Sequence, residues 1–125
     1  MSDLLVDTQA LLWWLADDPR LPAGARELIA EPGNLPVFSA ASVWEISIKA
    51  ALGKLEVSDD WPDAARADGF GELSIHVEHA RLAARLEWDH RDPFDRMLVA
   101  QALIEGVTLI TGDARIRAFP VASAW

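Results

Sequence analysis

Short apolar runs alternate along this chain with segments whose apolar residues recur at helical spacing. Continuous apolar runs too short for a helix are typical of strands that are buried on both faces of a parallel sheet. The expected strands are Leu4–Val6, Pro36–Ser39, Leu73–Ile75, Val107–Ile110 and a last one around Val121. Strands that alternate with helices predict an α/β fold, a three-layer α/β/α sandwich with a central, mostly parallel sheet.

The helical segments carry recognisable beginnings and ends. In residues 40–52, Val43 and Ile46 fall on one apolar stripe. Ser39 is a suitable N-cap for this helix, and Gly53 marks its end. The other helices are expected over residues 8–15, 22–30, 58–68 and 77–86, from 93 to the glycine at 106, and in a short segment ending at 117.

The stretch His90–Arg96 holds a dense group of charged and titratable side chains. Asp92 is a good helix N-cap, Pro93 fits the first helical position, and Asp95 falls in the first turn. A carboxylate in the first turn also balances the positive end of the helix dipole. Each of these acids therefore has a local explanation, and a functional role has to be argued from where other acids lie.

Composition limits the classes of function. The length of 125 residues suits one domain, spanning residues 1–125. No cysteine is present and the histidines show no convincing zinc spacing, so oxygen ligands must hold any metal, which favours Mg²⁺ or Mn²⁺. The sequence has neither a long apolar run nor a basic leader, so we expect a cytoplasmic protein with no membrane contact. The net charge of −9 argues against nucleic-acid binding through a broad basic face.

Four carboxylates are expected to meet at one edge of the sheet. Asp7 ends the first strand, and Asp113 follows the strand at 107–110. Asp95 sits in the first turn of the helix that leads to that strand, and Glu45 lies one to two turns into the helix after the second strand. Ligands of parallel sheets bind outside the carboxyl ends of the strands. Two carboxylates about 4 Å apart repel by roughly 4 kcal/mol at an effective dielectric near 20, a cost that a raised pKa or a divalent cation relieves.

Such a cluster suits metal-assisted hydrolysis of a phosphodiester, in which the cation neutralises the phosphate and lowers the pKa of a bound water. No side chain stands out as a general base. Local alternatives exist for all four acids: Asp7 as a helix cap, Glu45 as the i, i+4 partner of Lys49, Asp95 as a first-turn charge at the helix dipole, and Asp113 as a cap or turn residue. Their joint placement favours the functional interpretation.

At these positions the chain resembles the PIN-domain ribonucleases, specifically the toxin component of VapBC-type toxin–antitoxin pairs. The resemblance covers essentially the whole chain, and its most specific part is the stretch around Asp95. It rests on residues 4–8 (LLVDT), 39–46 (SAASVWEI), 90–102 (HRDPFDRMLVAQA) and 109–113 (LITGD). The fold of that family is the α/β/α sandwich around a parallel sheet that the hydrophobic pattern predicts.

The resemblance also implies roles for particular residues. The acidic metal-binding quartet would consist of Asp7, Glu45, Asp95 and Asp113. Thr8 and Ser39 would be hydroxyls behind the metal or on the substrate side, and Asp92 would be an additional acid that mainly caps its helix. Arg91 and Arg96 would contact phosphate or balance the acids, with solvated charges or salt bridges as the alternative.

The implied partners are an RNA substrate, a second copy in a homodimer, and a cognate antitoxin whose C-terminal segment covers the active-site groove. We therefore interpret the chain as a Mg²⁺- or Mn²⁺-dependent endoribonuclease toxin that an antitoxin neutralises. Two alternatives stay open. One is a catalytically silent PIN-like module that only binds a protein, and the other is a metal-dependent phosphoesterase that acts on small phosphate esters.

Overall fold

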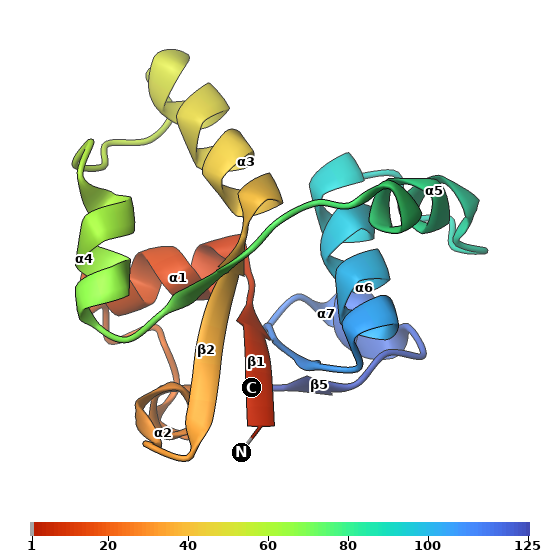
Figure 1. Ribbon diagram of the computed structural model, residues 1–125. Coiled ribbons are helices and arrows are strands. Elements are labelled where there is room, and N and C mark those ends of the chain that lie inside the picture. The colour runs from red at the N-terminus through yellow and green to blue at the C-terminus, as the bar shows by residue number, and fades with distance from the viewer. Residues whose placement is uncertain (1) are drawn as a thin grey trace.

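A computed structural model describes residues 2–125 and shows strands and helices in regular alternation (Figure 1). The strands are β1 (Ser2–Val6), β2 (Asn34–Ser39), β3 (Gly71–Leu73), β4 (Thr108–Ile110) and β5 (Ser123–Ala124). The helices are α1 (Thr8–Leu15), α2 (Ala23–Ala30), α3 (Ala40–Ala51), α4 (Trp61–Ala67), α5 (Val77–Arg85), α6 (Pro93–Glu105) and α7 (Ala114–Ala118). The strands pair in parallel, and their order across the sheet is β3-β2-β1-β4-β5.

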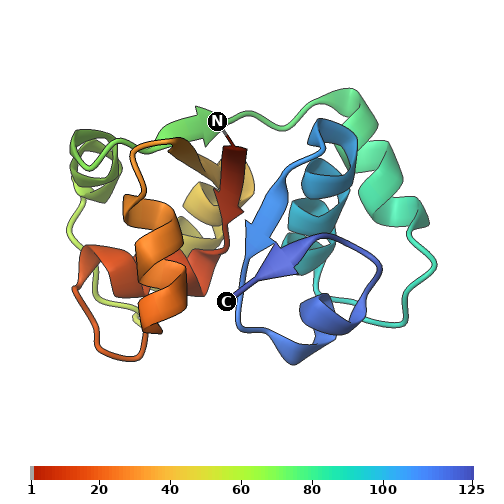
Figure 2. The ribbon, with the colours of Figure 1, turned by 90° about the horizontal axis from the view of Figure 1, so that it is seen from below.

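The sheet separates two layers of helices. In β1, Leu4 and Val6 belong to one hydrophobic core and Leu5 to the other, as the two-residue period of a strand requires. Ile110 and Leu109 of β4 divide between the cores in the same way. Seen from below, α1, α2 and α4 lie on one side of the strands and α5, α6 and α7 on the other (Figure 2). The predicted α/β/α sandwich with a parallel sheet is therefore confirmed.

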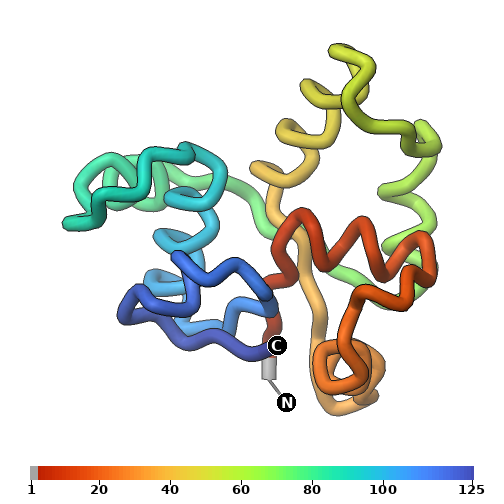
Figure 3. Tube along the Cα trace, turned by 180° about the vertical axis from the view of Figure 1, so that it is seen from behind, coloured from red at the N-terminus to blue at the C-terminus, as the bar shows by residue number. Residues whose placement is uncertain are grey.

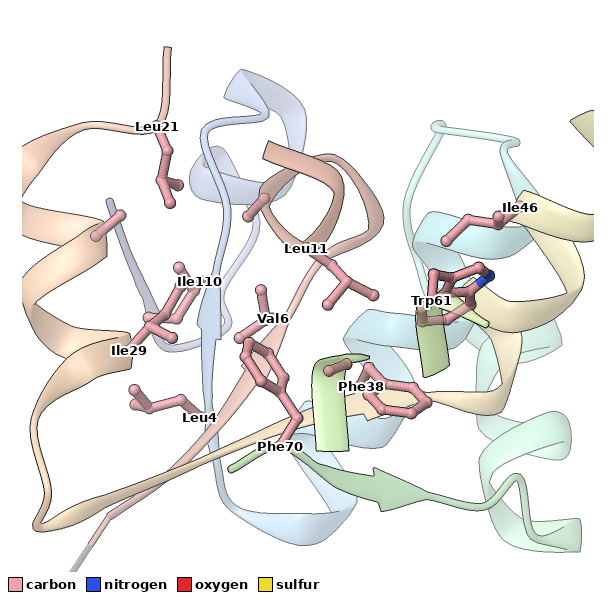
Figure 4. Close-up of a cluster of buried hydrophobic side chains, with 13 residues drawn as sticks. Leu4, Val6, Leu11, Leu21, Ile29, Phe38, Ile46, Trp61, Phe70 and Ile110 are labelled. Carbon is pink, nitrogen blue, oxygen red and sulfur yellow. The ribbon is translucent and has the colours of Figure 1, made fainter. Parts of the chain in front are cut away.

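The first core gathers bulky side chains from β1 and β2 and from the helices that cover them (Figure 4). Phe38 of β2 packs edge-on against Trp61 of α4, with ring centroids 5.4 Å apart. Leu11 of α1 and Val6 of β1 are fully buried beside them. Burial of each such side chain stabilises the fold by roughly 1.5–3 kcal/mol. This packing fixes α1 and α4 against the sheet.

Several helix boundaries agree with those predicted from capping residues. α1, α3 and α6 begin directly after Asp7, Ser39 and Asp92, and each of these side chains accepts a hydrogen bond from a backbone N–H of the first turn. α6 ends at Gly106, whose left-handed backbone (φ 67°) stops the helix. Within residues 2–125, none of the helices combines the length and apolar character that crossing a bilayer requires.

Two strands differ in position from the prediction. β3 covers Gly71–Leu73 rather than residues 73–75, because it pairs with Val37–Ser39 of β2. β5 covers Ser123–Ala124, and Val121 lies before it in a turn in which its N–H donates to the carbonyl of Phe119 (2.7 Å). Val121 packs against the second core, which accounts for its apolar character without placing it in a strand.

The strands β1, β2 and β4 end at one edge of the sheet, where α1 and α3 begin close together (Figure 3). The N–H of Asp7 donates to the carbonyl of Ile110 (3.0 Å) and joins the ends of β1 and β4. The Thr8 hydroxyl donates to the Ser42 hydroxyl (2.8 Å) and joins the first turns of α1 and α3. This edge carries the candidate site.

Candidate active site

A pocket of about 460 Å³ lies at the carboxyl edge of the sheet. It is lined by all four predicted acids: Asp7, Glu45, Asp95 and Asp113. They reach it from four places in the chain, namely the end of β1, the middle of α3, the first turn of α6 and the residue before α7. The parallel sheet therefore brings together acids that are far apart in the sequence.

Asp7 is the buried acid at the base of α1. Its Oδ1 accepts a hydrogen bond from the N–H of Ala10 (2.8 Å) and caps the helix. Burial raises the pKa of Asp7 to about 6, and the charges of Asp95 and Asp113 contribute to the increase. Hydrogen bonds from the Thr111 hydroxyl and the Ala10 N–H oppose this increase in pKa without cancelling it. The carboxylate form of Asp7 is therefore one that a nearby cation would stabilise.

Asp95 is held by a chain of two further side chains. Nε2 of His90 lies 2.7 Å from Oδ2 of Asp95, and Nη1 of Arg115 lies 2.8 Å from Nδ1 of His90. Arginine has no acceptor, so Nδ1 accepts and Nε2 of the neutral ring carries the proton that it donates to Asp95. Burial raises the pKa of Asp95, with a further increase from Asp92 and Asp113, and the hydrogen bond from His90 opposes it.

The other two acids of the pocket also have protein partners. Oε2 of Glu45 accepts a hydrogen bond from Nζ of Lys49 (2.9 Å), and the Glu45 side chain is only 12% exposed. Oδ1 of Asp113 accepts from the N–H groups of Arg115 and Ile116 and caps α7. The local roles that the sequence suggested for Glu45 and Asp113 are thus compatible with their place in the shared pocket.

The donor atoms of this pocket fit a hard divalent cation. The pocket lining contains carboxylate oxygens and, among the described residues, neither cysteine nor histidine. As the side chains stand, no three acidic or histidine residues within 2–125 are already grouped as metal ligands. Glu45 is turned to Lys49, and Asp95 to His90. A bound cation would therefore compete with the Lys49 and His90 contacts for these carboxylate oxygens.

The two predicted hydroxyls lie at different depths. Thr8 lines the pocket and donates to Ser42. Ser39 is completely buried at the start of α3, where its hydroxyl donates to Oε1 of Gln101 (2.5 Å) and accepts from the N–H of Ala41 (3.0 Å). Ser39 therefore ties α3 to α6 from below the pocket surface.

Three residues of the stretch before and within α6 lie outside the pocket lining. Asp92 caps α6 through Oδ1, which accepts from two backbone N–H groups, and Arg91 is exposed. The guanidinium of Arg96 donates at 2.7–2.9 Å to four backbone carbonyls, those of Ala83, Leu86, Trp88 and His90. With these bonds made, Arg96 organises the segment between α5 and α6.

The pocket also contains cationic and aromatic residues that were not anticipated there. Its cationic side chains are Arg20 and Lys49, and its aromatic ones are Trp13 and Trp125. A signal existed for Lys49, the i, i+4 partner of an acid, and for Trp13, which lies on the stripe of α1 that begins beside Asp7. Arg20 and Trp125 come from segments that only the folded chain brings to this edge.

Known proteins resemble this chain in sequence and in fold. Residues 4–122 match the model of the PIN domain. Ribonuclease VapC22 of Mycobacterium tuberculosis is 28% identical over 121 residues, which cover 94% of this chain and 92% of the relative. Ribonuclease VapC16 of the same organism is 43% identical over 75 residues, covering 54% and 52%. The crystal structure of VapBC2 from Rickettsia felis bound to a DNA fragment from its promoter has the same fold, with a TM-score of 0.72, 13% identity and 98% of each chain covered.

Proposed function

This chain belongs to the PIN-domain family, and from that premise we propose that it is a divalent-metal-dependent endoribonuclease, the toxin of a toxin–antitoxin pair. The observation that carries the proposal is the convergence of four carboxylates on one pocket, with a buried member, Asp7, whose pKa is raised to about 6. The ribonuclease names of the relatives and the VapBC assembly among the structural neighbours support it.

In this proposal Asp7, Glu45, Asp95 and Asp113 hold the cation through carboxylate oxygens. When bound, a divalent cation supplies positive charge for the phosphate and lowers the pKa of water at the site. His90, fixed by Arg115, donates to Asp95 and keeps that carboxylate in one orientation. Lys49 and Arg20 supply the cationic groups at the pocket that attract the RNA backbone.

The charge of the molecule bears on one proposed partner, the antitoxin. A net charge of −9 and an acidic pocket favour an antitoxin segment that carries basic side chains. We further propose a homodimer that acts in the cytoplasm, where RNA and antitoxin are both available. Light scattering of the protein alone and with its antitoxin measures these assemblies.

The central test compares Mn²⁺-dependent RNA cleavage by the wild type with cleavage by Asp7→Asn and Asp95→Asn. Both substitutions keep a polar side chain of the same shape and remove one charge, so we expect cleavage to fall by at least about 100-fold. Circular dichroism checks that the variants are folded. Asp63→Asn is the matched control, because Asp63 on α4 is 80% exposed and lies outside the pocket lining.

Undiminished cleavage by folded Asp7→Asn and Asp95→Asn would refute the assignment of these acids. Cleavage of small phosphate esters without cleavage of RNA would favour a general phosphoesterase. A protein that neither cleaves RNA nor binds Mn²⁺ in a calorimetric titration would be a protein-binding module.

A further inference from the structure

Two indole rings border the carboxylate pocket. Trp13 belongs to α1 and Trp125 follows β5, and both line the pocket together with Asp7 and Asp113. Their ring centroids are 6.1 Å apart and their planes are tilted by 40°. Each side chain is half-buried, so each indole packs on the first core and also presents surface to solvent.

A glycine next to one of the acids makes room for the Trp125 ring. A Cβ atom at Gly112 would lie 2.5–2.7 Å from Cε2, Cζ2 and Nε1 of Trp125, closer than packed atoms approach. The backbone of Gly112 does not have a positive φ, so the close approach of the indole is what calls for glycine here. Because Gly112 directly precedes Asp113, the ring is held next to an acid of the pocket.

Arg20 adds a fixed positive charge to this aromatic surface. Its guanidinium carbon lies 5.1 Å from the centroid of the Trp13 ring, a cation–π distance. Arg20 also donates to both carboxylate oxygens of Asp18, at 3.1 and 2.7 Å, which holds it over the ring. Arg20 and Trp13 line both the carboxylate pocket and a neighbouring groove of about 500 Å³ between α1 and α4. Trp13 therefore lies where the carboxylate pocket meets the second groove, and Trp125 lines the carboxylate pocket.

Resting on the proposed ribonuclease function, we infer that Trp13 and Trp125 form a stacking platform for one nucleobase of single-stranded RNA, next to the phosphate that is cut. A phosphate held beside Asp7 and Asp113 places an adjoining base at these rings, and Arg20 is positioned for a further phosphate. Stacking suits an acidic protein, because the faces of bases and indoles attract without opposite charges. The platform places the substrate and takes no part in the chemical step.

The experiment is a double-mutant cycle between the protein and the base. A short single-stranded RNA that spans one wild-type cleavage site is made intact and with an abasic ribose on the 5′ or the 3′ side of the cut. KM and kcat are measured for the wild type, Trp125→Leu, Trp125→Phe and Trp13→Leu. Leucine keeps an apolar side chain for the core, and phenylalanine keeps an aromatic ring. Trp44→Leu is the control, because Trp44 is 62% exposed, packs on Phe94 and lies outside the pocket lining.

For the wild type, we expect KM to rise by about 5- to 100-fold when the base is missing at one of the two positions, the range that stacking of one base gives. Trp125→Leu should raise KM for intact RNA by a similar factor, and its KM should rise no further on that abasic RNA. In both cases kcat should change much less. Trp125→Phe should restore part of the dependence on the base. Gly112→Ala, which pushes the indole aside, should behave like Trp125→Leu, and Trp44→Leu like the wild type.

A second readout does not depend on cleavage. Fluorescence anisotropy in EDTA measures how the Asp95→Asn protein, with and without Trp125→Leu, binds a labelled oligouridylate and its abasic counterpart. Tighter binding of the oligouridylate than of its abasic counterpart, with a difference that Trp125→Leu abolishes, supports the platform. This result would hold even if the wild type cuts no RNA and the nuclease proposal fails. Metal-dependent cleavage with equal losses on intact and abasic RNA in every variant overturns the platform and leaves the nuclease in place. Equal binding of both oligonucleotides by the Asp95→Asn protein overturns the platform as well.

Discussion

At the scale of single residues, three aspartates each cap the start of a helix but lie in different surroundings. Asp7, Asp92 and Asp113 each accept backbone N–H groups at the start of a helix. Asp7 and Asp113 line the pocket and Asp92 does not, and Asp7 is also buried, which raises its pKa to about 6. Asparagine caps a helix about as well as aspartate, so Asp→Asn changes separate the effect of charge from that of capping.

Asp7→Asn should stabilise the metal-free protein near neutral pH. The pKa of Asp7 in the fold, about 6, lies above the ordinary value of 3.8, so the folded state binds this proton more tightly than the unfolded chain does. Its contribution to stability is therefore present below about pH 4 and is lost as the pH rises through about 6. A shift of about two pKa units corresponds to roughly 3 kcal/mol as an upper bound. We expect Asp7→Asn to raise the free energy of unfolding by about 1–2 kcal/mol at about pH 7.

Urea unfolding of the wild type and Asp7→Asn in EDTA, from about pH 4 to about pH 8, measures this difference. The two free energies should be nearly equal at the acid end and diverge as the pH rises. Asp63→Asn, exposed on α4, should show no such divergence. An Asp7→Asn protein that is less stable than the wild type near neutral pH would contradict the prediction.

At the scale of elements, one side chain fastens the segment between α5 and α6. The carbonyls that Arg96 binds lie between residues 83 and 90, and one of them belongs to His90, which contacts Asp95. A single guanidinium therefore fixes the segment that orients an acid of the pocket. Arg96 therefore links the segment before α6 to the orientation of Asp95 in the pocket.

Arg96→Lys should destabilise the protein although the charge is kept. Lysine has one donor nitrogen and no planar fork, so several of the carbonyls would lose their partner. We expect the free energy of unfolding to fall by about 2–4 kcal/mol in urea titrations, with a loss of RNA cleavage as His90 moves. Arg85→Lys, exposed at the end of α5, is the control and should change little. Wild-type stability of Arg96→Lys would show that the four bonds are not what holds the segment.

At the scale of the whole molecule, the acidic balance makes stability depend on cations. With a net charge of −9 and four carboxylates around one pocket, a cation that binds only the folded state stabilises it, and the gain grows with the logarithm of the free cation concentration above its Kd. The gain is about 2.7 kcal/mol when the free ion is at 100 times its Kd. Mn²⁺ should therefore raise the Tm of the wild type and of Asp63→Asn, and should raise that of Asp95→Asn much less. Equal increases in Tm for all three proteins would place the bound cation elsewhere.

Local signals explain why much of this fold was predictable from the sequence. The start of α1 is set by an apolar run that meets Asp7, and the start of α6 by Asp92 and the proline after it. The grouping of the acids followed from one topological rule, that parallel strands share their carboxyl edge. β3 and β5 were misplaced, because pairing with β2 and β4 sets their positions, and the apolar residues Ile75 and Val121 that suggested strands lie outside them. Arg20 and Trp125 reach the pocket through packing between distant segments, which no local pattern records.

The strand order β3-β2-β1-β4-β5 also has a consequence for synthesis of the protein on the ribosome. β1 is made before the other four strands yet lies in the middle of the sheet, between β2, which follows soon, and β4, which emerges about a hundred residues later. Pairing between such distant segments is slow and cannot precede the arrival of both. For the same reason, Asp7 cannot meet Asp113 in the pocket until the segment after β4 has been made. Incomplete chains therefore carry no complete pocket, and a cell meets the proposed nuclease only after nearly all of residues 2–125 have been translated.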